Sequence, residues 1–428
     1  MLAAAPGAAA AVPPPRPGPA DVIVDDVGAD AAVSTLSIDD AIDRALRSNL
    51  ALIAEREQVP IARAERLSAR VRLNPVLSFG ADHLDVLGTR YDDTNRAGPQ
   101  EFFVRGDFGI MTGAKRKRRR EHAEAAVTLA EHRVRDAVRL LVLDVANACV
   151  DVQLAAELRA LARRNQELYQ GMVALDESRV AAGDIAPVEL TRIRIAAEQA
   201  GNAMLVAQAE LEVARNRLAL LLDSPEPLGV HEALRREGEV PKLAELRTIA
   251  ARSRPDLQVA RDEQRRSGVD IKRQIAEGKI DMSVGVELRR QQGLAGTGNS
   301  AGVFVSVPLP TSDRNQGGIE RARRQQRAAT AGTAATSRAV QTDVDDAHVA
   351  WRFAKARLAR YEGGVLSQAE EVLATVAYSY RRGEAGLVDL IDAQRAHAEV
   401  QRSYIAARAD YARALYTLEA ATGEALSR

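Results

Sequence analysis

Residues 183–190 read Gly-Asp-Ile-Ala-Pro-Val-Glu-Leu, and residues 383–390 read Gly-Glu-Ala-Gly-Leu-Val-Asp-Leu. With one shift of 200 positions, glycine aligns with glycine at the first place, valine with valine at the sixth, an acid with an acid at the seventh and leucine with leucine at the eighth. Agreement of several residue types in one register indicates an internal duplication. We therefore expect a chain built from two similar halves.

An apolar stripe with heptad spacing follows each copy of this segment. Steps of four and three residues connect Ile193, Ala197, Ala200, Met204, Ala207, Leu211, Ala214, Leu218 and Leu221. The same positions 200 residues later are Ala393, His397, Val400, Tyr404, Ala407, Tyr411, Ala414, Leu418 and Ala421. This spacing is typical of the packed face of a coiled coil. It predicts two helices, at about 188–222 and 388–421, that return from a turn at each glycine.

Longer helices are predicted before each turn. No proline occurs from 115 to 182, which corresponds to roughly 100 Å of helix, and none from 321 to 382, where Gly363 and Gly364 are expected to kink the helix. Shorter helices are expected near 37–73 and 243–277. The predicted organisation is a disordered Ala- and Pro-rich segment 1–35, a first repeat 36–222, a linker 223–241 rich in Pro and Gly, and a second repeat 242–423.

Two strands are predicted between the helices of each half. Apolar and polar residues alternate from 280 to 288, and a second apolar run spans 303–309. The glycine-rich stretch 293–302 predicts a long connection between them. A weaker pair occupies 77–82 and 102–108, separated by a polar loop at 85–100. Four strands with one apolar face leave unpaired edges, which lipid does not tolerate. Closure therefore requires further copies, and three copies supply twelve strands.

Composition argues against several other functions. Lys+Arg and Asp+Glu both number 59, so the balance of charge gives no support for nucleic acid as a partner. The sequence contains no run of 18 or more apolar residues, so no transmembrane helix is predicted. The only cysteine, Cys149, is expected to be buried in a helix. No nucleophile elbow, phosphate loop or zinc motif is present, and the six histidines form no metal-ligand pattern. We expect no enzyme activity, no cofactor and no specific metal site.

Two motifs carry a family resemblance that covers residues 36–423. Residues 380–383, Tyr-Arg-Arg-Gly, followed by Leu-Val-Asp-Leu-Ile-Asp-Ala-Gln at 387–394, resemble the periplasmic tip of the second helical hairpin in the TolC family of outer-membrane efflux proteins. Residues 113–116, Gly-Ala-Lys-Arg, resemble the Gly-Gly-Lys-Arg that begins the first long helix in the CzcC-like metal-efflux branch. Alanine replaces one of the two glycines here.

The resemblance implies a mainly α fold with a small β part. Members of this family are homotrimers in the outer membrane of Gram-negative bacteria. Lipid surrounds their twelve-strand β-barrel, which stands above a periplasmic α-helical tunnel. The tunnel docks onto a periplasmic adaptor, which links it to an inner-membrane pump. The expected function is a passive conduit that exports metal ions or small toxic compounds.

Candidate gate residues lie beside the second glycine turn. Asp389 and Asp392 are three residues apart on one helix face, so three copies would place two rings of carboxylates around a pore. In the family, matching aspartates line the closed periplasmic entrance, and Tyr380 matches a tyrosine that holds the gate shut. Ala385 stands where other members have a basic residue, so their salt bridge is not expected here.

The two glycine turns are candidate docking sites. Gly183 and Gly383 permit positive φ where a helix ends, and the resemblance implies that the adaptor docks at these tips. Asp184, Glu189 and Glu384 are further candidates for contacts with it.

Six consecutive basic residues occupy 115–120. Positive charge is unfavourable at a helix N-terminus, so something should compensate it. We expect anionic lipid headgroups at the periplasmic face of the membrane to do so.

Two other protein classes share some of these sequence features. A periplasmic adaptor also contains a helical hairpin, but normally one hairpin flanked by β-rich domains. A soluble coiled-coil scaffold would not need the amphipathic strand at 280–288. The duplicated hairpins and that strand favour the channel.

Overall fold

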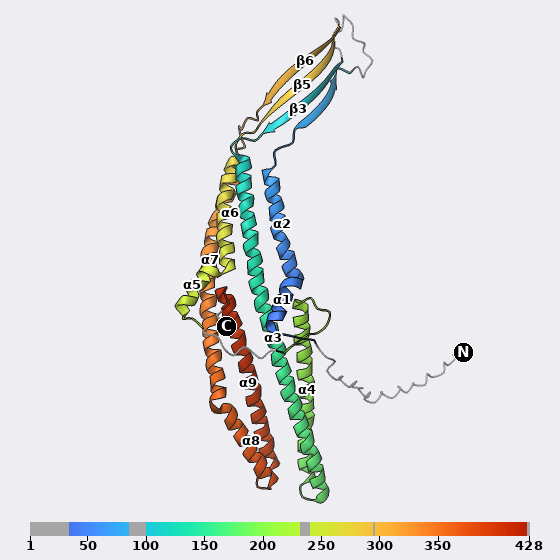
Figure 1. Ribbon diagram of the computed structural model, residues 1–428, viewed down its shortest axis with the longest axis vertical. Coiled ribbons are helices and arrows are strands. Elements are labelled where there is room, and N and C mark those ends of the chain that lie inside the picture. The colour runs from blue at the N-terminus through green and yellow to red at the C-terminus, as the bar shows by residue number, and fades with distance from the viewer. Residues whose placement is uncertain (1–33, 85–99, 232–239, 294–295, 426–428) are drawn as a thin grey trace, which may run out of the picture.

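The computed structural model describes residues 34–84, 100–231, 240–293 and 296–425. It is an elongated, predominantly helical molecule with a four-stranded sheet at one end and the tips of two helical hairpins at the other (Figure 1). The mainly α fold with a small β part is therefore confirmed. The predicted disordered segment and the polar loop at 85–100 lie almost wholly outside the described residues.

The same order of elements occurs twice along the chain. The first half contains α1 (Ile38–Ser48), α2 (Leu50–Arg70), β2 (Val76–Asp82), β3 (Glu101–Ile110), α3 (Lys115–Ala182) and α4 (Pro187–Leu221). The second half contains α5 (Leu243–Ser253), α6 (Pro255–Glu277), β5 (Met282–Gly293), β6 (Gly296–Ser306), α7 (Gln316–Arg360), the π-helical segment η1 (Tyr361–Val365), α8 (Leu366–Arg381) and α9 (Leu387–Thr422).

The long helices differ between the halves in one respect. As predicted, α3 is unbroken over 68 residues. Its counterpart bends at η1, where Gly364 has φ 144°, so the kink expected at the glycine pair is confirmed. A π-helical turn interrupts the regular i→i−4 hydrogen bonds of an α-helix, and such turns are a common cause of helix kinks.

The four longer strands form one antiparallel sheet in the order β2-β3-β5-β6. Alternation places most of the apolar side chains on one face, where Phe79 and Val303 are 73% and 75% exposed. Phe103 and Phe304 lie on the other face, beside Arg289 and Arg105. The opposite face carries charge pairs such as Arg105–Asp107 and Arg289–Glu287. Strands β2 and β6 each have one partner in the described chain, so the sheet ends in two open edges.

The long connection predicted at 293–302 is wrong. Strand β5 ends at Gly293 and β6 begins at Gly296, and most of that glycine-rich stretch is paired with β5. Glycine, asparagine and serine have weak strand propensity. Backbone hydrogen bonds to a neighbouring strand nevertheless hold these residues extended, because the ladder does not depend on side chains.

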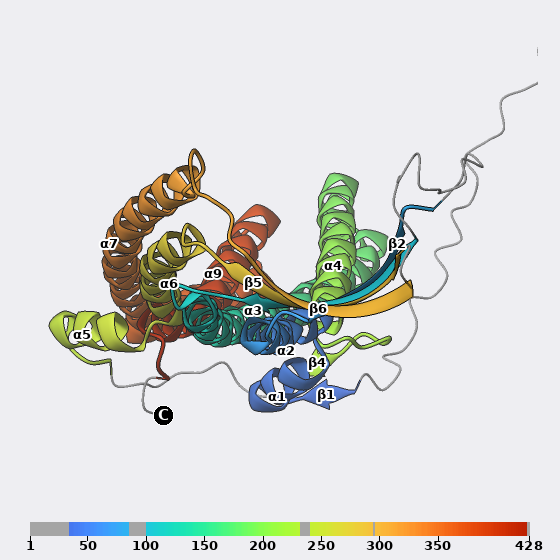
Figure 2. The same ribbon diagram turned by 90° about the horizontal axis from the view of Figure 1, so that it is seen from above.

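The helices lie in one layer. Below the sheet, α2, α3, α6 and α7 are successive neighbours (Figure 2). Towards the tips, α4, α3 and α9 continue the layer, and α7 and α8 lie against α9. Within the segment predicted as a linker, β4 (Gly229–Val230) pairs in parallel with β1 (Thr35–Leu36). None of the helices in the described ranges has the length and apolar character needed to cross a membrane.

The predicted heptad stripes form the packed faces of α4 and α9. All their members are buried or half-buried, and Ile193, Leu211, Leu218 and Ala407 are at most 1% exposed. Cys149 is fully buried beside them, as predicted. Burial of each such leucine stabilises the fold by about 1.5–3 kcal/mol.

In both halves, side chains at the break between two shorter helices cap the last carbonyls of the helix that returns from the glycine turn, α4 or α9. Between α1 and α2, Ser48 Oγ and Asn49 Nδ2 donate to the carbonyls of Leu222 and Leu221, at 2.7 and 3.0 Å. Between α5 and α6, the buried Arg254 donates to the carbonyl of Ala421 at 3.1 Å. The last carbonyls of a helix have no partner within the helix. Both halves supply that partner from the break between two short helices.

Candidate functional site

The two glycine turns form the end of the molecule opposite the sheet (Figure 1). Gly183 and Gly383 have φ values of 84° and 76°. After them, the amides of Asp184 and Glu384 donate to the carbonyls of Arg179 and Ser379, each at 2.9 Å. This is the left-handed helix end that glycine favours. The tips therefore have matching backbone geometry in both repeats.

The acidic candidates at these tips are accessible. Asp184 and Glu384 are exposed, and Glu384 pairs with Arg382 at 3.1 Å. Glu189 is half-buried in the first turn of α4. Asp184 therefore places an exposed carboxylate at the first tip, whereas the carboxylate of Glu384 at the second tip is paired with an arginine.

Asp389 and Asp392 lie one turn apart at the start of α9, and both are exposed. The Oδ2 atom of Asp389 accepts a hydrogen bond from the amide of Gly386 at 3.1 Å, so this carboxylate caps the helix. Asp392 makes no hydrogen bond or ion pair within the described part of the chain. Its carboxylate is therefore exposed to solvent in this chain.

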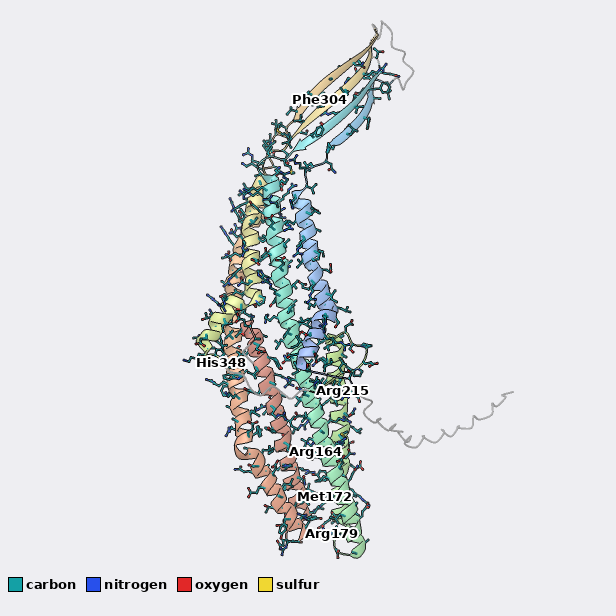
Figure 3. The ribbon with its side chains drawn as sticks, in the orientation of Figure 1. Arg164, Met172, Arg179, Arg215, Phe304 and His348 are labelled. Carbon is teal, nitrogen blue, oxygen red and sulfur yellow. The ribbon has the colours of Figure 1, made fainter. Side chains whose placement is uncertain are left out.

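Tyr380 connects the second hairpin to the first. The side chain is 7% exposed, and its hydroxyl donates to Oδ1 of Asp176 and accepts from Nη1 of Arg179, both at 3.1 Å. The guanidinium of Arg179 also lies 5.3 Å from the centre of the phenol ring. Figure 3 places Arg179 close to the tips. We call Tyr380, Asp176 and Arg179 the latch.

Burial, followed by the neighbouring Asp176 carboxylate, raises the pKa of Tyr380 above its ordinary value of 10.0. The tyrosine therefore stays neutral and remains a donor to Asp176 over the physiological range. Asp176 itself is 1% exposed, and besides the neutral Tyr380 hydroxyl it has a cationic neighbour, Arg179, at 3.7 Å.

Asp176 and Arg179 were missed in the sequence. One signal was present, because Asp176 follows the buried Tyr169 by seven residues and so places a charge on an apolar stripe. Such a charge requires a partner. Ala385 carries no charge, and the cation beside the Tyr380 ring is Arg179 of α3.

An apolar cluster surrounds the latch and joins the two hairpins. Its buried members come from both repeats and are Tyr169, Ile193, Ala196, Ala200, Tyr380, Leu387, Leu390 and Ile391. Contacts between the hairpins near the tips thus combine this small cluster with one polar group.

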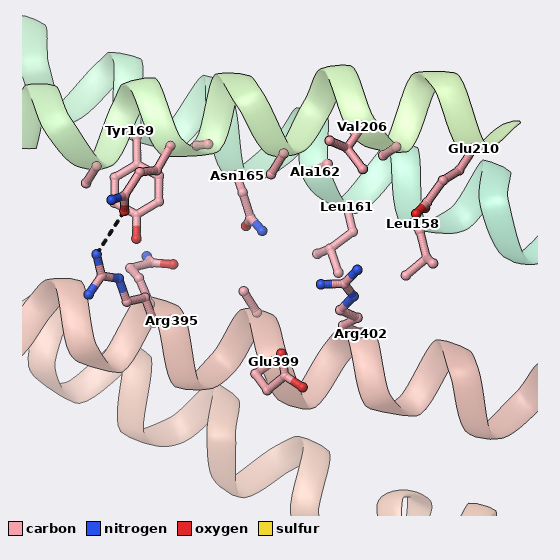
Figure 4. Close-up of a pocket in the computed structure, with 17 residues that line it drawn as sticks. Leu158, Leu161, Ala162, Asn165, Tyr169, Val206, Glu210, Arg395, Glu399 and Arg402 are labelled. Atoms are coloured by element: carbon pink, nitrogen blue, oxygen red, sulfur yellow. Dashed lines mark hydrogen bonds between the residues drawn. The ribbon is translucent and has the colours of Figure 1, made fainter. Parts of the chain in front are cut away.

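Behind the cluster, the hairpins separate around a cleft of about 470 Å³. Figure 4 shows Leu158, Leu161 and Val206 on one wall, and Arg395, Glu399 and Arg402 of α9 on the other. The hairpins meet again beyond it, through Arg408–Glu157 and Arg413–Asp151 at 2.7 and 2.5 Å. At the cleft itself, Nη2 of Arg395 in α9 donates to Oε1 of Gln199 in α4 at 3.2 Å, so a hydrogen bond also joins the hairpins here.

The basic run at 115–120 lies at the other end of α3. Nζ of Lys115 is 2.7 Å from Asp281, and Arg119 makes two hydrogen bonds to Glu277 at 2.6 and 2.9 Å. The hydrogen bond from Arg119 lowers the pKa of Glu277. These carboxylates from the second repeat compensate two of the six charges, so lipid is not needed for those two.

Among the described residues, no three His, Cys, Asp or Glu side chains gather where they could hold a metal ion. His132 contacts the carboxylate of Asp262, and His397 lies 3.2 Å from the side chain of Gln401. These histidines are therefore engaged in packing within the helical layer.

The chain belongs to the outer membrane efflux protein family, whose sequence profile matches residues 41–224 and 246–424. It is an efflux channel subunit of the Gram-negative outer membrane with a periplasmic part, and the predicted family is confirmed.

Three comparisons describe its relatives. The chain is 26% identical over 385 residues to the cobalt-zinc-cadmium resistance protein CzcC of Cupriavidus metallidurans, covering 87% of each. A membrane protein of Pseudomonas aeruginosa has a similar structure, with a TM-score of 0.78, 20% identity and 92% of both chains covered. The outer-membrane channel CmeC of Campylobacter jejuni superimposes with a TM-score of 0.77 at 14% identity, covering 91% of this chain and 86% of that one.

Proposed function

We propose that three copies of this chain close one twelve-strand barrel and one helical tunnel. The observation that carries the proposal is the sheet: one face is apolar and exposed, the other is charged, and both edges are open. Unpaired strand edges are not stable in lipid, so β2 of one copy would pair with β6 of the next. The single layer of helices beneath would close in the same way.

Asp389, Asp392 and Tyr380 are proposed as the gate at the tunnel entrance. Three copies would bring six carboxylates around the axis at the tips, which attracts cations and narrows the opening. The latch would hold the second hairpin against the first in the closed state. Opening would break it, and the bend at η1 would absorb the movement.

The tips are the proposed docking site for a periplasmic adaptor, and through it an inner-membrane pump. Gly183 and Gly383 would keep the turns narrow, while Asp184, Glu189 and Glu384 would face the partner. This assignment is supported by the accessibility of the tips and by the family's place in tripartite export systems.

The cargo is proposed to be metal cations, with small toxic compounds as the alternative. Support comes from the relative whose name records cobalt, zinc and cadmium resistance. The carboxylates of Asp389 and Asp392 would favour the passage of cations. In this proposal the channel is passive, and the pump supplies the energy.

Single-channel recording tests the proposed gate. In planar bilayers the Asp389→Ala/Asp392→Ala variant should conduct several-fold better than the parent, and block by multivalent cations should weaken. A Glu370→Ala/Glu371→Ala variant, which removes two exposed acids of α8, is the control for charge alone. Currents and block that match the parent in the aspartate variant would exclude this gate.

A further inference from the structure

A basic groove of about 850 Å³ opens where the helices meet the sheet. Its walls come from three places: the end of α2 with the chain that follows it, the end of β3, and the first turns of α3. This region lies between the sheet and the helical layer (Figure 1). The groove is remote from the latch and the tips, and the proposed gate does not use it.

Six basic side chains and no acidic one line the groove: Arg70, Arg72, Lys115, Arg116, Lys117 and Arg120. Lys115 is neutralised by Asp281, and Arg120 lies 3.5 Å from Glu124. The other four are exposed and form no ion pair with a described residue. The groove therefore concentrates uncompensated positive charge.

The backbone adds to this charge. Helix α3 begins at the floor of the groove, and its N-cap residue Ala114 provides no side-chain hydrogen bond. The first amide groups of a helix carry partial positive charge and bind anions readily. Basic side chains are unfavourable at such an end unless an anion offsets both contributions.

The upper wall shows which side of the sheet the groove faces. Phe108 and Ile110 line it, and they pair across the sheet with Val284 and Met282 on the apolar face. Leu73, which is 52% exposed, lies beside them. Apolar side chains followed directly by arginine and lysine match the change from acyl chains to phosphate groups at a membrane surface.

We propose that this groove binds the phosphate headgroup of an anionic phospholipid in the periplasmic leaflet of the outer membrane. Arg70, Arg72, Arg116 and Lys117 would hold the phosphate oxygens, and Phe108 and Ile110 would contact the upper part of the acyl chains. The bound lipid fixes the depth of the barrel in the membrane. It also compensates Arg116 and Lys117, the two residues of the basic run that form no ion pair with a described residue.

Native mass spectrometry of the full chain in detergent tests the site, with graded dioleoylphosphatidylglycerol as the probe. Removing two charges, in Arg116→Gln/Lys117→Gln, should weaken lipid retention about 10- to 30-fold, at about 1 kcal/mol for each charge. Arg70→Gln/Arg72→Gln should behave similarly. The matched control is Arg327→Gln/Arg338→Gln, which removes two exposed and unpaired arginines of α7.

Far-UV circular dichroism and channel conductance distinguish loss of the site from loss of the fold or of the channel, and both should remain at parent values. Retention of the lipid by both groove variants would overturn the proposal, as would equal losses in the control. Displacement of the lipid from the parent chain by millimolar inorganic phosphate would assign the groove to free phosphate and overturn the lipid assignment.

Discussion

The two repeats share their order of elements but differ in how their hairpins are held. In the first, α3 runs for 68 residues without a break, and it contributes Asp176 and Arg179 to the latch. In the second, the matching helix bends at Tyr361–Val365, and its tip carries Tyr380 and the two exposed aspartates. The duplication thus supplies one straight hairpin and one hinged hairpin, and a single latch joins them.

The largest effect is expected where the two repeats cap the C-terminal ends of α4 and α9 differently. Arg254 is buried and pairs with Asp256 and Asp343 at 2.6 and 2.9 Å, whereas Asn49 makes neutral hydrogen bonds. Arg254→Gln should lower the free energy of unfolding by about 3 kcal/mol, because it leaves two carboxylates without their cation. Asn49→Ala should lower it by about 1 kcal/mol.

Thermal unfolding followed by circular dichroism in detergent ranks the two variants. Similar shifts of the unfolding midpoint in both variants would show that the ion pairs of Arg254 with Asp256 and Asp343 give the second repeat no extra stability.

The latch is expected to have the next largest effect. Tyr380→Phe removes a hydrogen bond to a buried carboxylate, which is worth about 1.5–3 kcal/mol. The open state should therefore become at least about tenfold more populated in single-channel records. Tyr378→Phe is the control, because that exposed hydroxyl contacts Arg382 on its own helix. Equal open times in both variants would remove the latch from the mechanism.

The hinge should respond more weakly. Gly364 has φ 144°, which side-chain-bearing residues rarely adopt, so Gly364→Ala should strain the bend by about 1–3 kcal/mol. We expect altered gating with a lower unfolding midpoint. Gly363→Ala is the matched control, since no atom lies within 4 Å of the added methyl group. The hinge assignment fails if both alanines leave gating unchanged.

The smallest expected effect is a pH dependence of the latch. A folded-state pKa raised above 10.0 means that neutral Tyr380 stabilises the closed hairpins below pH 10, and that this contribution is lost as the pH rises through the raised value. Channel opening should therefore increase above pH 10. The Tyr380→Phe variant should show no such rise, and an identical rise in both proteins would assign it to another group.

Much of this fold could be predicted from local patterns. The prediction of 115–182 as one helix matches α3, and the heptad stripes and the kink at the glycine pair were also correct. These features depend on residues close in sequence. The strand at Gly296–Ser306 was shortened in the prediction because its pairing with β5, and not its own composition, keeps it extended.

The site was predicted only in part. The tip glycines and Tyr380 stand in recognisable motifs, but the partners of Tyr380 lie about 200 residues earlier. Lys115 and Arg119 likewise pair with residues that lie far away in the sequence, in the second repeat. Pairing between distant charges depends on how the helices pack, which no local spacing records.

The central claim is that one chain provides a third of a closed channel, and particle mass tests it most directly. Native mass spectrometry of the detergent-extracted chain should give three times the 46.1 kDa subunit, with no stable smaller form. A monodisperse 46.1 kDa particle that stays in solution without detergent would contradict the account.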